Sequence, residues 1–266
     1  MTEPIEILFE DRHVVVVKKP AGILSQSGGA VGTLPDLVSY LKEREAARTP
    51  SDGTEPYIGV VHRLDAGVGG AMVYAKKTYA AAALSESVRS REHFTKEYLC
   101  VVSGVPAESA GEYRDLMLRD SGANKSYVVD RMRAGVREAH LSYRVLQTVE
   151  RAGDLYSLLC VTLGTGRSHQ IRCQMSYHGT PILCDGKYGG RRPEGVEMPG
   201  IALWSYHLAF VHPANLPTSD RKKSKPQTQR MQKRQEKKPV FENPDVYCPP
   251  DRAQMPWGWF DVLGDL

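Results

Sequence analysis

The residues that could do chemistry are concentrated in two short segments about a hundred residues apart. The first is His62-Arg63-Leu64-Asp65, which sets one carboxylate beside two side chains that can carry positive charge. It directly follows the apolar run 57–61, so a buried strand is expected to lead into it. This position favours a carboxylate that does chemistry over one that only carries surface charge, which makes Asp65 the first candidate.

The second segment is Gly166-Arg167-Ser168-His169-Gln170-Ile171-Arg172. Ser168 is typical of a helix N-cap, so a helix is expected from there to about His178. On that helix Arg172 lies one turn beyond His169 and shares its face. Arg172 can therefore point toward a partner carboxylate, although a surface salt bridge is the simpler explanation for a lone arginine.

A third candidate lies on an expected strand, 94–102. Because side chains alternate along a strand, Phe94, Lys96 and Tyr98 are expected on one face. Tyr98 thus shares a face with a lysine. For this residue alone, a core tyrosine with a bonded hydroxyl is the ordinary explanation.

Together these motifs resemble the signature of the RluA family of pseudouridine synthases, which isomerise uridine inside RNA. The family carries a catalytic aspartate in His-Arg-Leu-Asp, a tyrosine in Lys-x-Tyr and an arginine in Gly-Arg-x-His-Gln-Ile-Arg. The resemblance implies that Asp65, Tyr98 and Arg172 are catalytic. It covers roughly residues 5 to 213 and resumes near Pro239. Supporting matches are Lys19-Pro20 with Gly22, Pro181-Ile182 with Asp185, Tyr188-Gly189, Leu208-Ala209-Phe210 and His212-Pro213.

The family's reaction breaks the bond between ribose carbon 1′ and uracil nitrogen 1, and rejoins the base through carbon 5. It needs no cofactor and no metal. The resemblance implies that Asp65 either attacks the ribose or removes a proton from it, and both routes stay open. Arg172 would keep Asp65 charged in a closed pocket. Tyr98 would stack on the uracil and is a candidate base for carbon 5, although an ordinary tyrosine pKa near 10 suits that task poorly.

RNA is the expected partner, and the target uridine must be flipped out of its stack. Arg63 is the candidate to fill the gap, because a guanidinium can stack while it holds phosphate. Ribosomal RNA is the family's most frequent target and transfer RNA the next. His62 suits a structural role in the loop, since the chemistry needs no imidazole. The full set expected to contact RNA is Arg63, His62, Lys19, Arg167, His169 and Lys96.

Several positions depart from the family pattern. After Asp65 the family commonly continues x-x-Thr-Ser-Gly, whereas this chain has Ala66-Gly67-Val68-Gly69-Gly70. Gln174 stands where a histidine is common, and Cys184 where a glycine is common. None of these changes removes a catalytic residue, but the missing hydroxyls alter the hydrogen bonding around Asp65. Many relatives also carry a small N-terminal RNA-binding domain, which is not expected here.

Most of the expected elements are strands. They cover 5–9, 14–17, 71–75, 94–102, 139–147 and 155–163, and helices are expected over about 35–45 and from an N-cap at Thr78 to about Arg91. Many strands with few helices between them indicate an α+β fold on a largely antiparallel sheet, which the resemblance identifies as the pseudouridine synthase fold. Residues 1–266 are expected to form a single catalytic domain with an insertion at 214–239.

Composition is that of a folded protein without membrane or metal features. The chain has 266 residues, of which 41% are apolar, and no run approaches the roughly 20 apolar residues that cross a bilayer. The start lacks the order of a secretory signal, so we expect a cytoplasmic monomer that binds no membrane. The five cysteines are scattered without a Cys-x-x-Cys pair, which predicts reduced thiols and no zinc site.

The net charge of +4 is small, but the positive charge is clustered. Between Arg221 and Lys238 there are nine basic residues and one acidic residue, a net charge of +8 that leaves −4 for the rest of the chain. A segment this polar cannot bury enough apolar surface to offset the entropy lost when it becomes ordered. A solvated loop is therefore expected. A solubility role and an RNA-tethering role are weighted equally, because basic runs are common and unspecific.

Two other functions remain open. A catalytically silent RNA-binding or ribosome-assembly module on the same fold would be expected to lack the aspartate, the tyrosine or the arginine. A hydrolase that uses Asp65 should show a second catalytic carboxylate. Asp185 is the only candidate for that second group, and its position favours a turn residue.

Overall fold

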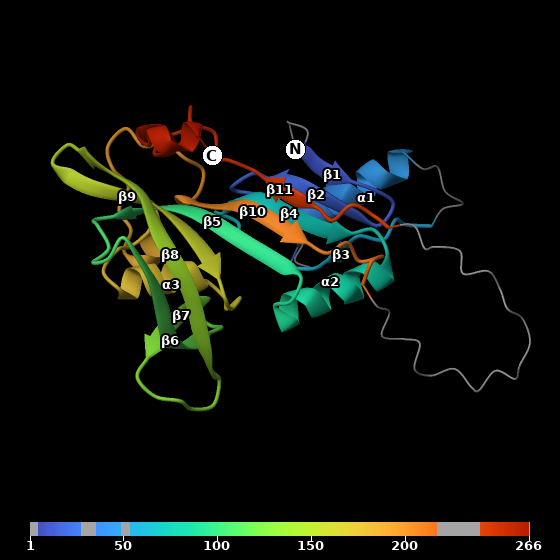
Figure 1. Cartoon of the computed structure of the whole chain (residues 1–266), viewed down its shortest axis with the longest axis horizontal. Helices are drawn as coiled ribbons and strands as arrows, with labels where there is room; N and C mark the ends of the chain where they lie inside the picture. Colours follow the sequence, from blue (N-terminus) through green and yellow to red (C-terminus); the bar gives the residue numbers. More distant parts are fainter. Residues whose placement is uncertain (1–4, 28–35, 49–53, 217–239, 266) are drawn as a thin grey trace, which may run out of the picture.

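The computed structural model describes residues 5–27, 36–48, 54–216 and 240–265 and centres on one 11-stranded sheet (Figure 1). The strand order is β1-β2-β4-β10-β5-β9-β8-β6-β7, with β3 beside β4 and β11 beside β10. Among the described strands only the β10–β4 pair is parallel. The expected α+β class with a largely antiparallel, mixed sheet is confirmed. The strands are β1 (Ile7–Glu10), β2 (Val14–Lys19), β3 (Gly59–Val60), β4 (Gly69–Ala75), β5 (Phe94–Ser103), β6 (Ala110–Asp120), β7 (Lys125–Val129), β8 (Val136–Arg151), β9 (Asp154–Leu163), β10 (Leu203–Phe210) and β11 (Asp245–Tyr247).

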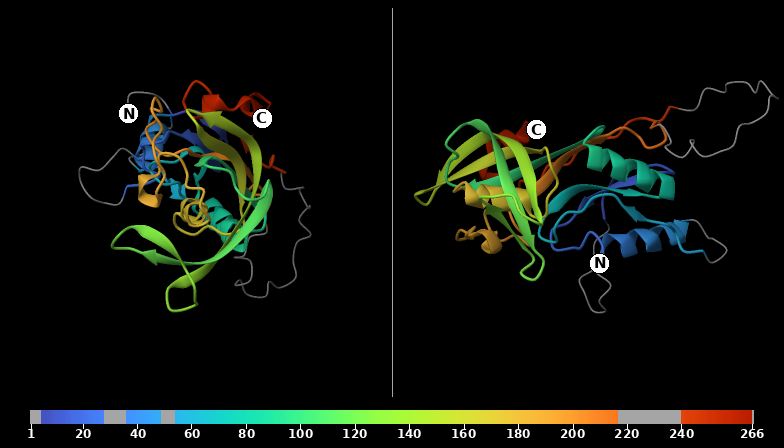
Figure 2. Two further views of the ribbon diagram at one scale, coloured as in Figure 1. Left: turned by 90° about the vertical axis from the view of Figure 1, so that its left-hand side faces the viewer. Right: turned by 90° about the horizontal axis from the view of Figure 1, so that it is seen from below.

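Helices cover both faces of the half of the sheet that contains β2 and β4. Figure 2 shows α1 (Leu37–Arg48) and α2 (Thr78–Ser90) on opposite sides of these strands. Side chains of β2 alternate accordingly: Val15 and Val17 pack with Leu37 and Leu41 of α1, whereas Val14 and Val16 pack with Leu84 of α2. Burial on both faces explains why the strand is an unbroken run of valines.

The other half of the sheet is built from long, curved strands that surround α3 (Gln170–Tyr177) (Figures 1 and 2). This short helix is buried on more than one side. Ile171 and Met175 belong to the main core, and Cys173 packs with Met117 and Tyr188 in a second cluster. Arg172 is carried by the same turn and therefore lies inside the molecule, at 9% exposure.

Three expected helix starts are corrected. Ser168 does not cap α3: His169 occupies the N-cap with a left-handed φ of 52° and no side-chain cap bond, and the Ser168 hydroxyl bonds Arg119 instead. Thr78 is the first residue of α2 rather than its cap. The first helix begins at Leu37, because Asp36 caps it by accepting a hydrogen bond from the Ser39 N–H at 3.1 Å.

The basic run at 221–238 lies outside the described residues, but both flanks of the expected insertion are described. The Asn215 side chain donates to the Phe241 carbonyl at 2.8 Å and accepts the Phe241 N–H at 3.1 Å. His212 donates its N–H to the Asn243 side chain at 2.8 Å and stacks on the Phe241 ring at 4.7 Å. The two flanks of the expected insertion are therefore joined to each other by hydrogen bonds.

The five cysteines are all free, as expected. Within the described ranges, no three His, Cys, Asp or Glu side chains converge on a point that could hold a metal ion. Nor does any helix in the described part of the chain have the length and apolar character needed to span a bilayer.

Candidate active site

One cavity of about 670 Å³ joins the segments that carry the sequence motifs. Its walls come from the loop between β3 and β4, the end of α2, the start of β5, and the segment 163–172. Strands and turns far apart in the sequence thus place their polar side chains around one space. Among the residues singled out from the sequence, the cavity is lined by His62, Arg63, Asp65, Lys96, Tyr98, Arg167, His169 and Arg172.

The loop that carries Asp65 is held mainly by hydrogen bonds to its backbone. The Ser25 hydroxyl donates to the Leu64 carbonyl at 2.7 Å and accepts the Leu64 N–H at 3.1 Å. The Gly22 N–H donates to the Ala66 carbonyl at 2.7 Å. The segment that follows β2 therefore fixes the backbone of Leu64 and Ala66, the two neighbours of Asp65. Ser25 was not singled out from the sequence, because a single serine in a Ser- and Gly-rich loop carries no motif.

Lys19 also supports the Asp65 loop, but it does not line the cavity. Its side chain is fully buried, and Nζ donates to the carbonyls of Pro20 at 3.0 Å and Ala66 at 3.2 Å. Burial lowers the pKa of Lys19 to about 8, while the charge of Asp65 acts in the opposite direction. The expectation that Lys19 contacts RNA is corrected, because no part of its surface is exposed to bind a ligand.

His62 fixes the start of the loop. It is 8% exposed, and its Nε2 accepts the Val73 N–H at 3.2 Å, so the neutral ring carries its proton on Nδ1. Burial, reinforced by the charge of Lys96, lowers the pKa of His62 to about 3. The ring therefore stays neutral, as suits a residue that orders a loop.

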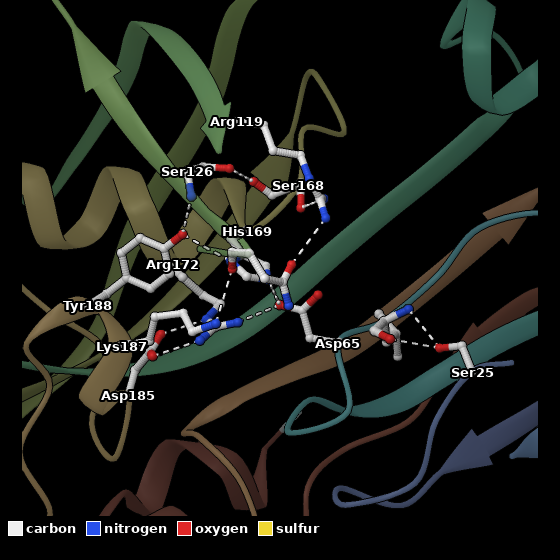
Figure 3. Close-up of polar contacts among 12 residues, drawn as sticks. Ser25, Asp65, Arg119, Ser126, Ser168, His169, Arg172, Asp185, Lys187 and Tyr188 are labelled. Atoms are coloured by element: carbon white, nitrogen blue, oxygen red, sulfur yellow. Dashed lines mark hydrogen bonds and ion pairs between the residues drawn. The ribbon is translucent and has the colours of Figure 1, made fainter. Parts of the chain in front are cut away.

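Arg172 links two carboxylates (Figure 3). Its Nη1 donates to Asp65 Oδ2 at 2.7 Å, while Nε and Nη2 donate to Asp185 Oδ2 and Oδ1 at 2.6 and 2.8 Å. Burial acts to lower the pKa of Arg172, but the bonds and charge of Asp185, and then of Asp65, outweigh it and raise the pKa. Asp185 thus holds the guanidinium in a bidentate grip and leaves one edge of it for Asp65.

Asp185 has a larger role than the turn residue expected from the sequence. Its backbone does form a turn, accepting the N–H groups of Tyr188 and Gly190. Its side chain, however, is only 1% exposed, and both carboxylate oxygens are engaged by Arg172. A carboxylate committed in this way is not free to act as the second acid of a hydrolase. The sequence signal for this role was only the family match at Asp185.

His169 approaches Asp65 from the same side as Arg172. Its Nε2 lies 3.6 Å from Asp65 Oδ2, and its Nδ1 lies 3.0 Å from the Tyr188 hydroxyl. Burial lowers the pKa of His169, although the charge of Asp65 opposes this effect. The imidazole is therefore neutral near pH 7 and closes one wall of the cavity beside the carboxylate.

Tyr98 faces the cavity from β5 at 6% exposure. Phe94 and Lys96 line the same cavity, so the period-two prediction of a shared face is confirmed. Burial raises the pKa of Tyr98 above its ordinary value, and the nearby charge of Asp65 adds to the shift. The phenol therefore keeps its proton, which makes it a worse base than its residue type suggested.

Positive charge gathers at the mouth of the cavity. Arg63 is exposed there, and Arg167 donates from Nε to the Glu138 carbonyl at 2.8 Å. Arg89 and Arg91, at the end of α2, also line the mouth and were not singled out from the sequence. The sequence did offer a signal for these two arginines, because they lie shortly before the strand that carries Lys96 and Tyr98.

The departures from the family pattern have structural counterparts. At Gly69 the ring of Trp204 fills the space that a Cβ would occupy, and Trp204 Nε1 donates to the Cys248 carbonyl at 2.7 Å. Gln174 is fully buried and donates to Asp115 at 2.7 Å. Cys184 adopts a φ of 65°, a left-handed conformation that explains why glycine suits this position.

Comparison with known proteins gives one consistent result. A family model described as RNA pseudouridylate synthase matches residues 13–177. The chain is 34% identical over 229 residues to ribosomal large subunit pseudouridine synthase D of Xanthomonas campestris, covering 80% of this chain and 63% of that protein. It is also 34% identical over 223 residues to an uncharacterized RNA pseudouridine synthase of Aquifex aeolicus, covering 79% and 66%. The chain therefore spans about 63% of the length of the first of these relatives.

Solved structures agree on the fold. The human protein RNA pseudouridylate synthase domain containing 1 matches with a TM-score of 0.63 at 22% identity, over 94% of this chain and 85% of that one. A second human protein, RNA pseudouridylate synthase domain containing 4, matches with a TM-score of 0.61 at 23% identity, over 77% of this chain and 84% of that one. The expected pseudouridine synthase fold is confirmed. Because the family model covers well over half of the chain, this protein belongs to the RNA pseudouridylate synthase family, as the motifs around Asp65 and Arg172 predicted.

Proposed function

We propose that this protein converts uridine to pseudouridine in RNA, with Asp65 as the essential catalytic group. The proposal is carried by one observation: the Asp65 carboxylate lines a cavity large enough for a flipped nucleotide and is held there by Arg172 at 2.7 Å. Isomerisation needs a charged carboxylate next to the sugar and no redox partner. A buried arginine at this distance favours that charged form.

Each of the three motif residues receives a role. Asp65 attacks ribose carbon 1′ or removes a ribose proton; its position suits either step. Arg172 orients Asp65 through the 2.7 Å contact of its Nη1 and sets a positive charge beside the carboxylate. Tyr98 packs its ring against the uracil, and its raised pKa argues against a role as the free base that accepts the carbon 5 proton.

RNA is the proposed partner, and the basic mouth is the proposed contact. Exposed Arg63 stands next to the cavity and is the residue proposed to replace the flipped base. Arg167 and Lys96 are proposed to hold phosphate, and His169 to face the sugar beside Asp65. Ribosomal RNA is the proposed substrate class, on the analogy of the Xanthomonas relative named for the ribosomal large subunit.

The direct test is a map of pseudouridines in total RNA from cells with and without this gene. A site that disappears and is restored by the recombinant protein on the isolated RNA would establish the activity and identify the substrate together. An unchanged map, with no pseudouridine formed by the purified protein on ribosomal or transfer RNA, would refute the proposal.

A silent RNA-binding module on this fold is the alternative function. It is disfavoured because Asp65, Tyr98 and Arg172 are all present around one cavity. Residues 1–266 are further proposed to act as one catalytic domain, as a monomer in the cytoplasm. Light scattering with and without RNA tests the oligomeric state, and cell fractionation tests the location.

A further inference from the structure

A chain of polar contacts leads from Asp65 away from the cavity into the fold (Figure 3). Asp65 Oδ2 faces His169 Nε2 at 3.6 Å, and His169 Nδ1 meets the Tyr188 hydroxyl at 3.0 Å. The Tyr188 oxygen in turn accepts the Ser126 backbone N–H at 2.8 Å. Tyr188 is 5% exposed and does not line the cavity, so it cannot touch a substrate directly.

The direction of these bonds fixes the protons. A backbone N–H can only donate, so the Tyr188 oxygen is an acceptor toward Ser126 and keeps its own proton for another partner. Burial raises the pKa of Tyr188 to about 12, so that proton stays in place at neutral pH. The available acceptor is His169 Nδ1. The proton of the neutral imidazole must then lie on Nε2, where it points at the Asp65 carboxylate.

The opposite arrangement is disfavoured by charge. With a proton on Nδ1, the bare Nε2 lone pair of His169 would face the negative Asp65 oxygen at 3.6 Å. The donor arrangement replaces this repulsion with attraction.

Tyr188 is itself held from several sides. Its ring lies 5.1 Å from the Arg172 guanidinium and 5.1 Å from the Lys125 ammonium. Its carbonyl accepts the Ser176 hydroxyl at 2.6 Å. These contacts from α3 and β7 hold the ring in place, so the Tyr188 hydroxyl stays beside His169 Nδ1.

We propose that Tyr188 is a positioning residue for the reaction: it sets the tautomer of His169 so that Nε2–H points toward Asp65 Oδ2, 3.6 Å away. This inference rests on the proposed function. The contacts of Arg172 and His169 both fall on Asp65 Oδ2. Oδ1 is restrained by neither of them and is the oxygen assigned to the reaction.

The groups that face His169 come from four elements. They are Asp65 from the loop before β4, Arg172 from α3, Lys187 from the turn after Asp185, and Arg119 from β6. The three cations oppose an added proton on the imidazole, and Asp65 favours it. The Tyr188 hydroxyl acts with the cations, because a donor aimed at Nδ1 stabilises only the neutral ring.

The first experiment compares Tyr188→Phe with wild type in single-turnover pseudouridine formation across pH. The variant keeps the ring and its contacts with cations but loses the hydroxyl. We expect turnover to fall roughly tenfold to a hundredfold, the scale of one lost hydrogen bond in a reacting assembly, with RNA affinity changed less than about twofold. The acid limb of the profile should move to higher pH, because the imidazole is then protonated more readily.

Tyr40→Phe is the matched control. The Tyr40 hydroxyl also accepts a backbone N–H, that of Ile5 at 3.2 Å, but it lies on α1, away from the cavity. It should leave turnover and the pH profile unchanged. A merely structural role for Tyr188 would give both variants the same small loss of stability and no shift of the acid limb, and that outcome would overturn the proposal.

The second experiment reads the tautomer without any substrate. Nitrogen-15 NMR of histidine-labelled protein, with His169→Gln to assign the signal, should show a protonated Nε2 and an unprotonated Nδ1 in wild type. Tyr188→Phe should show a mixture of tautomers or the imidazolium. A wild-type proton on Nδ1 would overturn the proposal even in an active enzyme. If wild type makes no pseudouridine, the proposed function fails, while the tautomer still decides whether Tyr188 controls His169.

Discussion

Asp65 is supported from two sides by different kinds of contact. On the side of β2, the contacts of Lys19, Gly22 and Ser25 all reach backbone atoms of the residues next to Asp65. On the side of α3, Arg172 and His169 reach the carboxylate itself. The first set fixes the path of the backbone around Asp65, and the second fixes the direction of the Asp65 side chain.

This difference divides the expected effects of mutation into two classes. Changes on the α3 side should reduce turnover first, because they alter the group proposed to react, and a change of Arg172 should also reduce stability, because Arg172 holds the buried Asp185. Changes on the β2 side should reduce stability first, because unsatisfied backbone groups in a buried loop cost folding free energy. The following predictions test that division, from the largest expected effect to the smallest.

Asp65→Asn should abolish pseudouridine formation while RNA affinity and melting temperature stay close to wild type. The amide keeps the shape of the side chain but cannot act as a nucleophile or base, and losing such a group costs several powers of ten in turnover. Single-turnover release of tritium from carbon 5 measures the effect. Asp130→Asn, at an exposed position, is the control. Residual turnover above about a tenth of wild type would contradict the role of Asp65.

Arg172→Ala should reduce turnover further than Arg172→Lys, although both lose the planar fork that holds Asp185. The alanine variant also leaves Asp185 buried at 1% side-chain exposure without its cation, at a cost of about 3–5 kcal/mol of stability. The same tritium assay and chemical denaturation measure the two effects. Equal turnover in the two variants would mean that the positive charge at this position does not matter.

Lys19→Met should change how stability depends on pH. The folded-state pKa of Lys19 is lowered from 10.5 to about 8, so between these values the unfolded chain binds more proton than the folded one. Stability of wild type should therefore rise with pH across this window, by at most about 3 kcal/mol. The methionine variant should lack this rise.

Urea unfolding at pH 7.5 and pH 10 measures the difference, with Lys18→Met as the control. Lys18 neighbours Lys19 on β2 but is partly exposed and pairs with Glu6 at 3.2 Å. If Lys18→Met removed the same pH dependence, the assignment to the buried Lys19 would be wrong.

Deleting residues 219–238 should change stability least. The described flanks are already joined by Asn215 and Phe241, so closing the chain between them leaves the fold intact. If the basic run binds phosphate, RNA affinity should fall for all sequences and its salt dependence should flatten. A neutral segment of equal length separates charge from length. An unchanged salt slope would leave only the solubility role.

The sequence was most informative where function constrains neighbouring residues. His62 to Asp65 and Gly166 to Arg172 are contiguous motifs, and alternation along β5 was enough to place Tyr98 beside Lys96. The α+β class followed from the many strands. These features depend on local order, which a single sequence contains.

What the sequence could not supply depends on contacts between distant segments. The two hydrogen bonds between Arg172 and Asp185 join a helix to a turn. An aspartate that follows a short apolar run gives no indication of such a partner in the sequence. The burial of Lys19 against the Asp65 loop and the raised pKa of Tyr98 likewise depend on distant segments that come together only in the folded protein. Ser168 failed as a cap because His169 turns left-handed and starts the helix one residue later.

The contact between Gly69 and Trp204 couples two positions that lie far apart in the sequence. A serine at position 69 would collide with the indole ring, which already fills the space of its Cβ. A smaller residue at position 204 would remove that collision, but it would leave the Cys248 carbonyl without its indole donor and open space beside Trp257. A hydroxyl can therefore be introduced next to the Asp65 loop at position 69 only together with a change at position 204 that also replaces the lost hydrogen bond and packing.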